Sequence, residues 1–92
     1  MVFEVRVHPE AARFIRKLDS KAQQRIKNAL FLLEEDPFCS RSKVDIKKLR
    51  GTKGRQNLFR LRIGEYRAIY SIEGKIVWVT DVFRREKGYT GI

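Results

Sequence analysis

Three arginines in the run 58–70 have the spacing of side chains that share one surface. Arg60 and Arg62 lie two residues apart in an alternating apolar segment. Because side chains of a β-strand alternate between faces, both arginines point the same way. If Gly64-Glu65 forms a two-residue turn, the chain returns antiparallel and Arg67 lies directly opposite Arg62. The spacing therefore predicts three guanidinium groups on one face of a hairpin.

This arrangement favours an anionic ligand. Like charges directly opposite each other destabilise a sheet by a few tenths to about 1 kcal/mol, so stability alone would favour Glu or Thr at one of these positions. A bound anion removes the conflict, and the planar guanidinium group grips phosphate with two parallel hydrogen bonds. The alternative is that the arginines diverge on a solvated face. The cluster predicts a phosphate site.

The net charge agrees with a polyanionic partner. The 92 residues contain 21 Lys and Arg against 11 Asp and Glu, a formal charge of +10. Ten basic and two acidic residues lie between Arg41 and Arg67, so the charge is concentrated around the arginines. Nucleic acid is the expected partner, and an acidic protein is a second one that can bind as well. A membrane surface would instead favour a basic amphipathic helix with few acids.

Residues for other kinds of catalysis are scarce. His8 is the single histidine and Cys39 the single cysteine, so no metal-ligand cluster and no Ser-His-Asp set can be placed. The sequence has no Gly-rich phosphate loop before a helix. A nuclease of this sequence is expected to work without a metal or other cofactor, and His8, next to a proline, is not its expected base. The lone Cys39 cannot form an intrachain disulfide, and a cytoplasmic location is expected.

The segments before the arginines predict one strand and two helices. Apolar and polar residues alternate over 2–7, as in a half-buried strand. A proline suits the first turn of a helix over 9–18. A second amphipathic helix is expected from about Ser20 to about Glu35, because Pro37 then ends it. The short link makes the two helices an antiparallel hairpin.

The last third of the chain is rich in strands. A short edge segment is expected at 47–50, followed by the runs 57–63, 66–73 and 75–83, with tight turns at Gly64-Glu65 and Glu73-Gly74. The expected class is α+β: a three-stranded antiparallel meander, with the N-terminal strand and the helix hairpin packed on one face. All of it is expected to form a single domain, residues 1–92. The apolar runs are too short to span a membrane.

The third strand and the tail add residues to the arginine face. Trp78 is expected there, either stacked on a base or covered by the tail or a bound partner. Arg84, Arg85, Lys87 and Tyr89 follow in a polar segment that is expected to return beside the arginines. An aromatic side chain among basic ones suits an unpaired base whose phosphates are held nearby.

The segments around the arginines resemble a known toxin superfamily. Lys48-Leu49-Arg50-Gly51, Leu58-Phe59-Arg60-Leu61-Arg62 and Tyr66-Arg67-Ala68-Ile69-Tyr70 are similar to the most recognisable stretch of the RelE/ParE toxins. The expected order of elements resembles that superfamily over nearly the whole chain. The resemblance to the RelE branch implies a metal-independent endoribonuclease that cleaves messenger RNA in the ribosomal A site. There the 2′-hydroxyl attacks the adjacent phosphate, which leaves a 2′,3′-cyclic phosphate and a 5′-hydroxyl.

The resemblance implies a role for each matching residue. Arg67 would stabilise charge on the phosphate under attack, and Arg85 would stabilise the transition state or help the 5′-oxygen leave. Tyr89 would stack on the RNA base, while Arg60 and Arg62 would orient the RNA, with Arg62 in the catalytic group. The wider RNA-binding surface would include Lys48, Arg50, Arg84 and Lys87. Well-studied bacterial members carry lysines in the places of Arg60 and Arg62. Arginine, with a pKa above about 12, is a poor base, so the general base is unassigned.

The resemblance also implies partners. Toxins of this kind are neutralised by an antitoxin, so a RelB-like protein that wraps around the chain is expected, together with the ribosome and messenger RNA. No membrane and no small-molecule cofactor is expected. Two other functions stay open: a ParE-like protein would share the fold and inhibit DNA gyrase, and a non-catalytic RNA- or ribosome-binding module would bind phosphates without chemistry.

Overall fold

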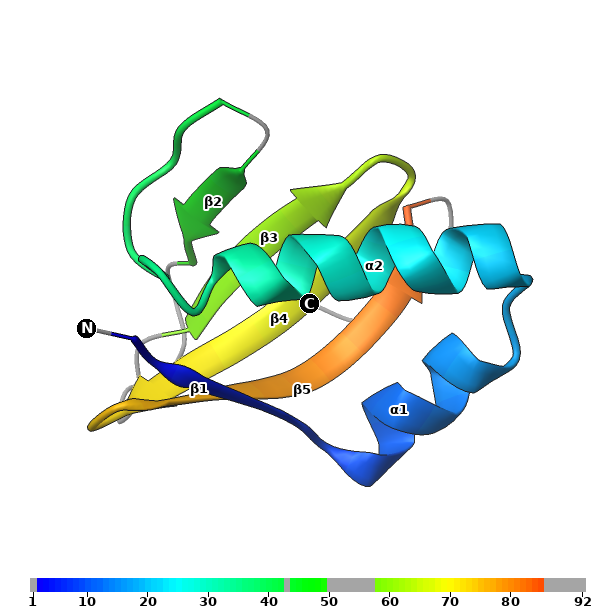
Figure 1. Cartoon of the computed structure of the whole chain (residues 1–92), viewed down its shortest axis with the longest axis horizontal. Helices are drawn as coiled ribbons and strands as arrows, with labels where there is room; N and C mark the ends of the chain where they lie inside the picture. Colours follow the sequence, from blue (N-terminus) through cyan, green and yellow to red (C-terminus); the bar gives the residue numbers. More distant parts are fainter. Residues whose placement is uncertain (1, 43, 50–57, 86–92) are drawn as a thin grey trace.

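Two helices lie across one face of a mixed β-sheet (Figure 1). The structure, a computed structural model, describes residues 2–42, 44–49 and 58–85. Within these residues the elements are β1 (Glu4–Val7), α1 (Pro9–Arg16), α2 (Ser20–Leu32), β2 (Asp45–Lys48), β3 (Leu58–Ile63), β4 (Tyr66–Glu73) and β5 (Ile76–Arg84). The strands follow the order β1-β5-β4-β3-β2 across the sheet. The predicted α+β class, with an antiparallel β3-β4-β5 meander, is confirmed.

One detail of the expected arrangement is wrong. β1 does not pack on a face of the sheet with the helices but extends the sheet, pairing parallel to β5 at its edge. β2 forms the opposite edge, antiparallel to β3. The sequence could not distinguish a strand packed on the sheet from a strand paired at its edge. Alternation of apolar and polar residues indicates which side chains are buried, but not which strand accepts and donates the backbone hydrogen bonds.

The two helices begin as the sequence predicts. The imidazole of His8 accepts a hydrogen bond from the amide of Glu10 at 3.3 Å and caps α1. The carboxylate of Asp19 accepts one from the amide of Ala22 at 2.8 Å and caps α2. α2 ends at Leu32, earlier than expected, because the following amides bond to carbonyls three residues back, and this tightens the last turn.

The core lies between the helices and the inner face of the sheet. Its members with the least exposure are Ile26 and Leu33 near α2, Leu61 on β3, Ala68 and Tyr70 on β4, and Val77 and Val79 on β5. The Tyr70 ring stacks on Phe59 with centroids 5.5 Å apart. Its hydroxyl donates to the carbonyl of Pro37 at 2.8 Å, in a fully buried position. This bond ties the loop between α2 and β2 to the middle of the sheet.

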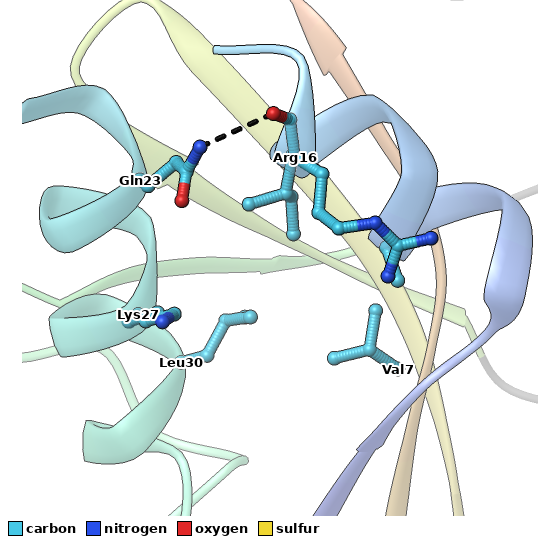
Figure 2. Close-up of a pocket in the computed structure, with 7 residues that line it drawn as sticks. Val7, Arg16, Gln23, Lys27 and Leu30 are labelled. Atoms are coloured by element: carbon cyan, nitrogen blue, oxygen red, sulfur yellow. Dashed lines mark hydrogen bonds between the residues drawn. The ribbon is translucent and has the colours of Figure 1, made fainter. Parts of the chain in front are cut away.

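A hollow of about 330 Å³ separates the two helices (Figure 2). Val7, Ala12, Ile15 and Leu30 make its apolar walls, and Arg16, Gln23 and Lys27 line its rim. The amide of Gln23 donates to the carbonyls of Arg16 at 3.2 Å and Leu18 at 2.8 Å, which links α2 to the end of α1. In the part of the chain that the structure describes, no helix is long and apolar enough to cross a membrane.

Candidate nucleic-acid interface

The predicted pairing of the arginines is confirmed. In the β3-β4 hairpin Arg62 pairs with Arg67, Ile63 with Tyr66, and Arg60 with Ile69. Gly64 has a φ of +59°, the left-handed conformation that this two-residue turn requires. The inner face of the hairpin is apolar and buried beneath the helices, so the three arginines lie on the outer face.

The charges of three neighbouring arginines act on Arg67. Burial is the largest cause that lowers the pKa of Arg67 from its ordinary value, and the nearby charges of Arg62, Arg60 and Arg85 lower it further. We call these four residues the arginine cluster. Three guanidinium groups, from β3 and the end of β5, thus lie within electrostatic range of Arg67 on β4, which is the arrangement expected of an anion site.

Two members of the arginine cluster differ in how they are held. One terminal nitrogen of Arg67 donates to the carbonyls of Gly64 and Tyr66, both at 3.1 Å, so this side chain is braced against the hairpin turn. The Nε of Arg60 is buried and has no hydrogen-bond partner among the described residues. A buried donor without a partner lowers the stability of the fold.

β2 contributes an acidic residue that the sequence analysis did not assign. Asp45 pairs with Arg62 and Lys47 pairs with Arg60, so both lie on the outer face. The two carboxylate oxygens of Asp45 lie 3.4 Å from an Arg60 nitrogen and 3.9 Å from an Arg62 nitrogen. The sequence holds no signal for this contact, because the register of an edge strand that is distant in sequence is a tertiary property.

Arg85 and Arg84 lie on different sides of the sheet. The amide of Arg85 donates to the carbonyl of Glu65 at 2.6 Å, so Arg85 sits beside the β3-β4 turn with the arginine cluster. Arg84 pairs with Tyr66 and therefore faces the helices. Its guanidinium lies 5.4 Å from the centre of the Tyr66 ring and donates to the hydroxyl at 3.2 Å. The expectation that Arg84 lies beside the other arginines is wrong.

A β-bulge explains the position of Arg84. The β4-β5 register shifts between Ile69 and Tyr70, which leaves Thr80 as an extra residue in β5. Strict alternation from Val79 would have put Arg84 on the outer face, and the extra residue reverses the alternation. At the bulge the Thr80 hydroxyl donates a hydrogen bond to the carbonyl of Ile69 at 3.3 Å.

The other residues predicted to bind RNA do not share one place on the sheet. Trp78 lies on the outer face, partly covered, with the Arg6 guanidinium 5.6 Å from its ring centre. Lys48 pairs with the core residue Phe59, so it points to the helix side at the edge of the sheet, while its neighbour Lys47 points to the outer face. Predicted residues outside the described part of the chain are Arg50, Lys87 and Tyr89.

The side chains of this surface have the chemistry that a phosphate ligand would need. Within residues 2–42, 44–49 and 58–85 no group of three or more His, Cys, Asp or Glu side chains is placed to hold a metal ion. Four guanidinium groups, one with an unused buried donor, can bind a phosphodiester and stabilise negative charge that grows on it. Such preorganised charge needs no movement of the protein at the moment of reaction.

Known proteins resemble this chain over almost its full length. RelE1 of Methanocaldococcus jannaschii is 29% identical over 91 residues, which cover 97% of each chain. A chain in the crystal structure of the archaeal RelE–RelB complex from Pyrococcus horikoshii OT3 is 30% identical with a TM-score of 0.79, and the match covers 96% of this chain and 100% of that one. The free Escherichia coli toxin RelE, in a double arginine-to-alanine mutant, is 26% identical with a TM-score of 0.68, covering 96% and 88%.

The family of this chain is shown by a match to a protein-family model. The model described as the ParE toxin of type II toxin–antitoxin systems matches residues 5–89, which include the helices, the whole meander and the arginine cluster. This span is most of the chain. The chain therefore belongs to the RelE/ParE family of toxins from type II toxin–antitoxin systems.

Proposed function

We propose that this toxin is a metal-independent endoribonuclease that cleaves messenger RNA in the ribosomal A site and so inhibits translation. The observation that supports it is the arginine cluster, in which like charges crowd on adjacent strands at a cost to stability. A protein that bound no anion there would gain stability from a neutral or acidic residue at one of these positions. The similarity to RelE proteins points to the same chemistry.

In this proposal the scissile phosphate lies between Arg62 and Arg67, which face each other across the hairpin. Arg67, braced by the turn carbonyls, meets the charge that grows on the phosphate as the 2′-oxygen attacks. Arg85 stabilises the 5′-oxygen as it leaves. Arg60 offers its terminal guanidinium nitrogens to a neighbouring oxygen of the RNA. These residues act by positioning and by electrostatic stabilisation.

The proposal includes the partners of the single toxin domain over residues 1–92. Ribosome-bound messenger RNA is the substrate, and the cytoplasm is the site of action. Because the Pyrococcus horikoshii relative forms a RelE–RelB complex, we propose that a RelB-like antitoxin binds this chain too. The charge of +10 favours rapid capture of an acidic partner.

A second candidate is inhibition of DNA gyrase. It is favoured by one observation: the family model that matches the chain is described as the ParE toxin. In this case the arginine cluster would contact an acidic surface of the target and no RNA would be cut. A non-catalytic RNA- or ribosome-binding module is the third reading of the same charges.

Primer extension on a message translated in a purified system tests the proposal. The wild-type protein is expected to cut the message in the presence of a chelator and only when ribosomes are present. Arg67→Ala is expected to lower the cleavage rate about 100-fold to 1,000-fold, as loss of one charge-stabilising donor does. Arg13→Ala, which removes an exposed arginine of α1, is the matched control and should cleave normally.

The outcomes separate the three readings. Absence of ribosome-dependent cleavage, with gyrase-dependent DNA damage in its place, would establish the gyrase reading. Binding to ribosomes without either effect would leave a binding module. Near wild-type cleavage by Arg67→Ala, with the fold verified by circular dichroism, would refute the role of Arg67.

A further inference from the structure

The proposed reaction needs a group that takes the proton of the attacking 2′-hydroxyl, and the arginine cluster does not supply one. A guanidinium group is protonated and holds no lone pair that could accept a proton at neutral pH. The rate gain from a positioned general base is about 100-fold to 10,000-fold, so its identity matters to the mechanism.

Three other titratable side chains of the described residues lie away from the cluster. Tyr66 and Tyr70 face the helices, on the opposite side of the sheet from the cluster. Burial raises the pKa of Tyr70 above its ordinary value and keeps it protonated. His8 follows β1, which three strand spacings, about 14 Å, separate from β3. None of these groups can reach a phosphate between Arg62 and Arg67.

Asp45 is a carboxylate whose contacts join it to the arginine cluster. It continues the row in which Arg62 faces Arg67, one strand further out. Each carboxylate oxygen meets one guanidinium, Arg60 at 3.4 Å and Arg62 at 3.9 Å. The charged groups nearby on the same face include Lys47 on β2, Arg60 and Arg62 on β3, Arg67 on β4, Asp81 on β5 and Arg85 after β5.

The contacts of Asp45 leave it available to a ligand. Its side chain is 52% exposed, and the guanidinium nitrogens lie beyond the usual 2.7–2.9 Å of a strong charged hydrogen bond. A carboxylate offers about four lone-pair positions, so two long contacts do not exhaust it.

We propose that the carboxylate of Asp45 is the general base of the cleavage reaction, an inference that rests on the proposed function. An Asp45 oxygen takes the proton of the 2′-hydroxyl while the 2′-oxygen forms a bond to phosphorus. The bond from phosphorus to the 5′-oxygen breaks, and that oxygen takes a proton from water. The products are a 2′,3′-cyclic phosphate and a 5′-hydroxyl, and Asp45 returns its proton to solvent.

Single-turnover cleavage on programmed ribosomes, at saturating toxin, tests this role. Asp45→Asn keeps the size of the side chain and removes its basicity, so the rate constant should fall about 100-fold or more. Affinity for ribosomes carrying a 2′-deoxynucleotide at the cleavage site should be unchanged or tighter, because a negative charge beside the phosphate is lost. Glu35→Gln, which neutralises an exposed carboxylate three residues after the end of α2, should match wild type in both measurements.

Chemical rescue distinguishes a base from a mere counter-ion. In Asp45→Ala, added acetate should restore more cleavage than formate at equal concentration, since proton transfer follows the basicity of the acceptor. A carboxylate that only balances charge would show no such order. Equal rescue by the two anions, or an Asp45→Asn rate within threefold of wild type, would overturn the inference while leaving the endoribonuclease proposal intact. A wild-type protein that does not cleave at all would overturn both.

Discussion

Tyr70→Phe removes one buried hydroxyl and leaves the aromatic ring in its stack. Tyr70 is 0% exposed, and its hydroxyl donates to the carbonyl of Pro37, itself buried, at 2.8 Å. The phenylalanine ring keeps the contact with Phe59, so the change isolates the hydrogen bond. The bond holds the loop that leads to β2, and β2 carries Asp45.

The expected loss of stability follows from the carbonyl that is left behind. A buried acceptor without its partner costs about 1–3 kcal/mol. Taking about 2 kcal/mol, the melting temperature of a chain of this size should fall by about 8–16 °C. The slope of the free energy of unfolding against urea concentration should not change, because the surface exposed on unfolding is the same.

The stability deficit of Tyr70→Phe, meaning its free energy of unfolding subtracted from that of wild type, should also depend on pH. Burial, and to a smaller extent the Asp36 carboxylate, raise the pKa of Tyr70 in the folded protein, while Arg41 lowers it slightly. Above pH 10 the unfolded chain loses the proton and the folded chain keeps it, so wild type loses up to about 1.4 kcal/mol of stability per pH unit from this group. Tyr70→Phe has no such loss. The deficit of the variant should therefore shrink from about 2 kcal/mol at pH 7 to about 0.6 kcal/mol at pH 11.

Urea unfolding followed by circular dichroism at the two pH values measures both effects. Tyr66→Phe is the control, because the Tyr66 hydroxyl accepts a longer bond, 3.2 Å, from Arg84 in a partly buried site. At pH 7 Tyr66→Phe should lose less free energy of unfolding than Tyr70→Phe. A Tyr70→Phe deficit below about 0.5 kcal/mol at pH 7, or one that stays constant up to pH 11, would show that the buried hydrogen bond is not a main support of the fold.

Three further changes have defined outcomes. Gly64→Ala places a Cβ at a φ of +59° and 3.1 Å from the Arg25 guanidinium, so urea unfolding should show a loss of about 1–2 kcal/mol. Sulfate at about 10 mM, too dilute for a general salting effect, should raise the melting temperature of the wild type by binding between the arginines, and Arg62→Gln should abolish that rise. Arg41→Ala should cost about 2 kcal/mol in urea unfolding, because this side chain donates to the carbonyls of Leu32, Asp36 and Cys39.

Much of the candidate site is a local property and could be predicted from the sequence. Alternation over 58–63 and a two-residue turn at Gly64 are enough to set the pairing of Arg62 with Arg67. Strand alternation and hairpin register depend on neighbours a few residues away, so no tertiary information is needed. The helix caps at His8 and Asp19 are local for the same reason.

Tertiary structure decided what lies around that hairpin. The pairing of Asp45 with Arg62 depends on which strand β2 joins and in which register, and the parallel pairing of β1 with β5 depends on where the chain returns after the helices. The bulge at Thr80 turns Arg84 toward Tyr66 and away from the outer face. By itself the sequence determined the arginine pair, because neighbouring residues encode a hairpin. Only the folded chain could bring an acid to it, since contacts between distant strands are chosen by packing of the whole sheet.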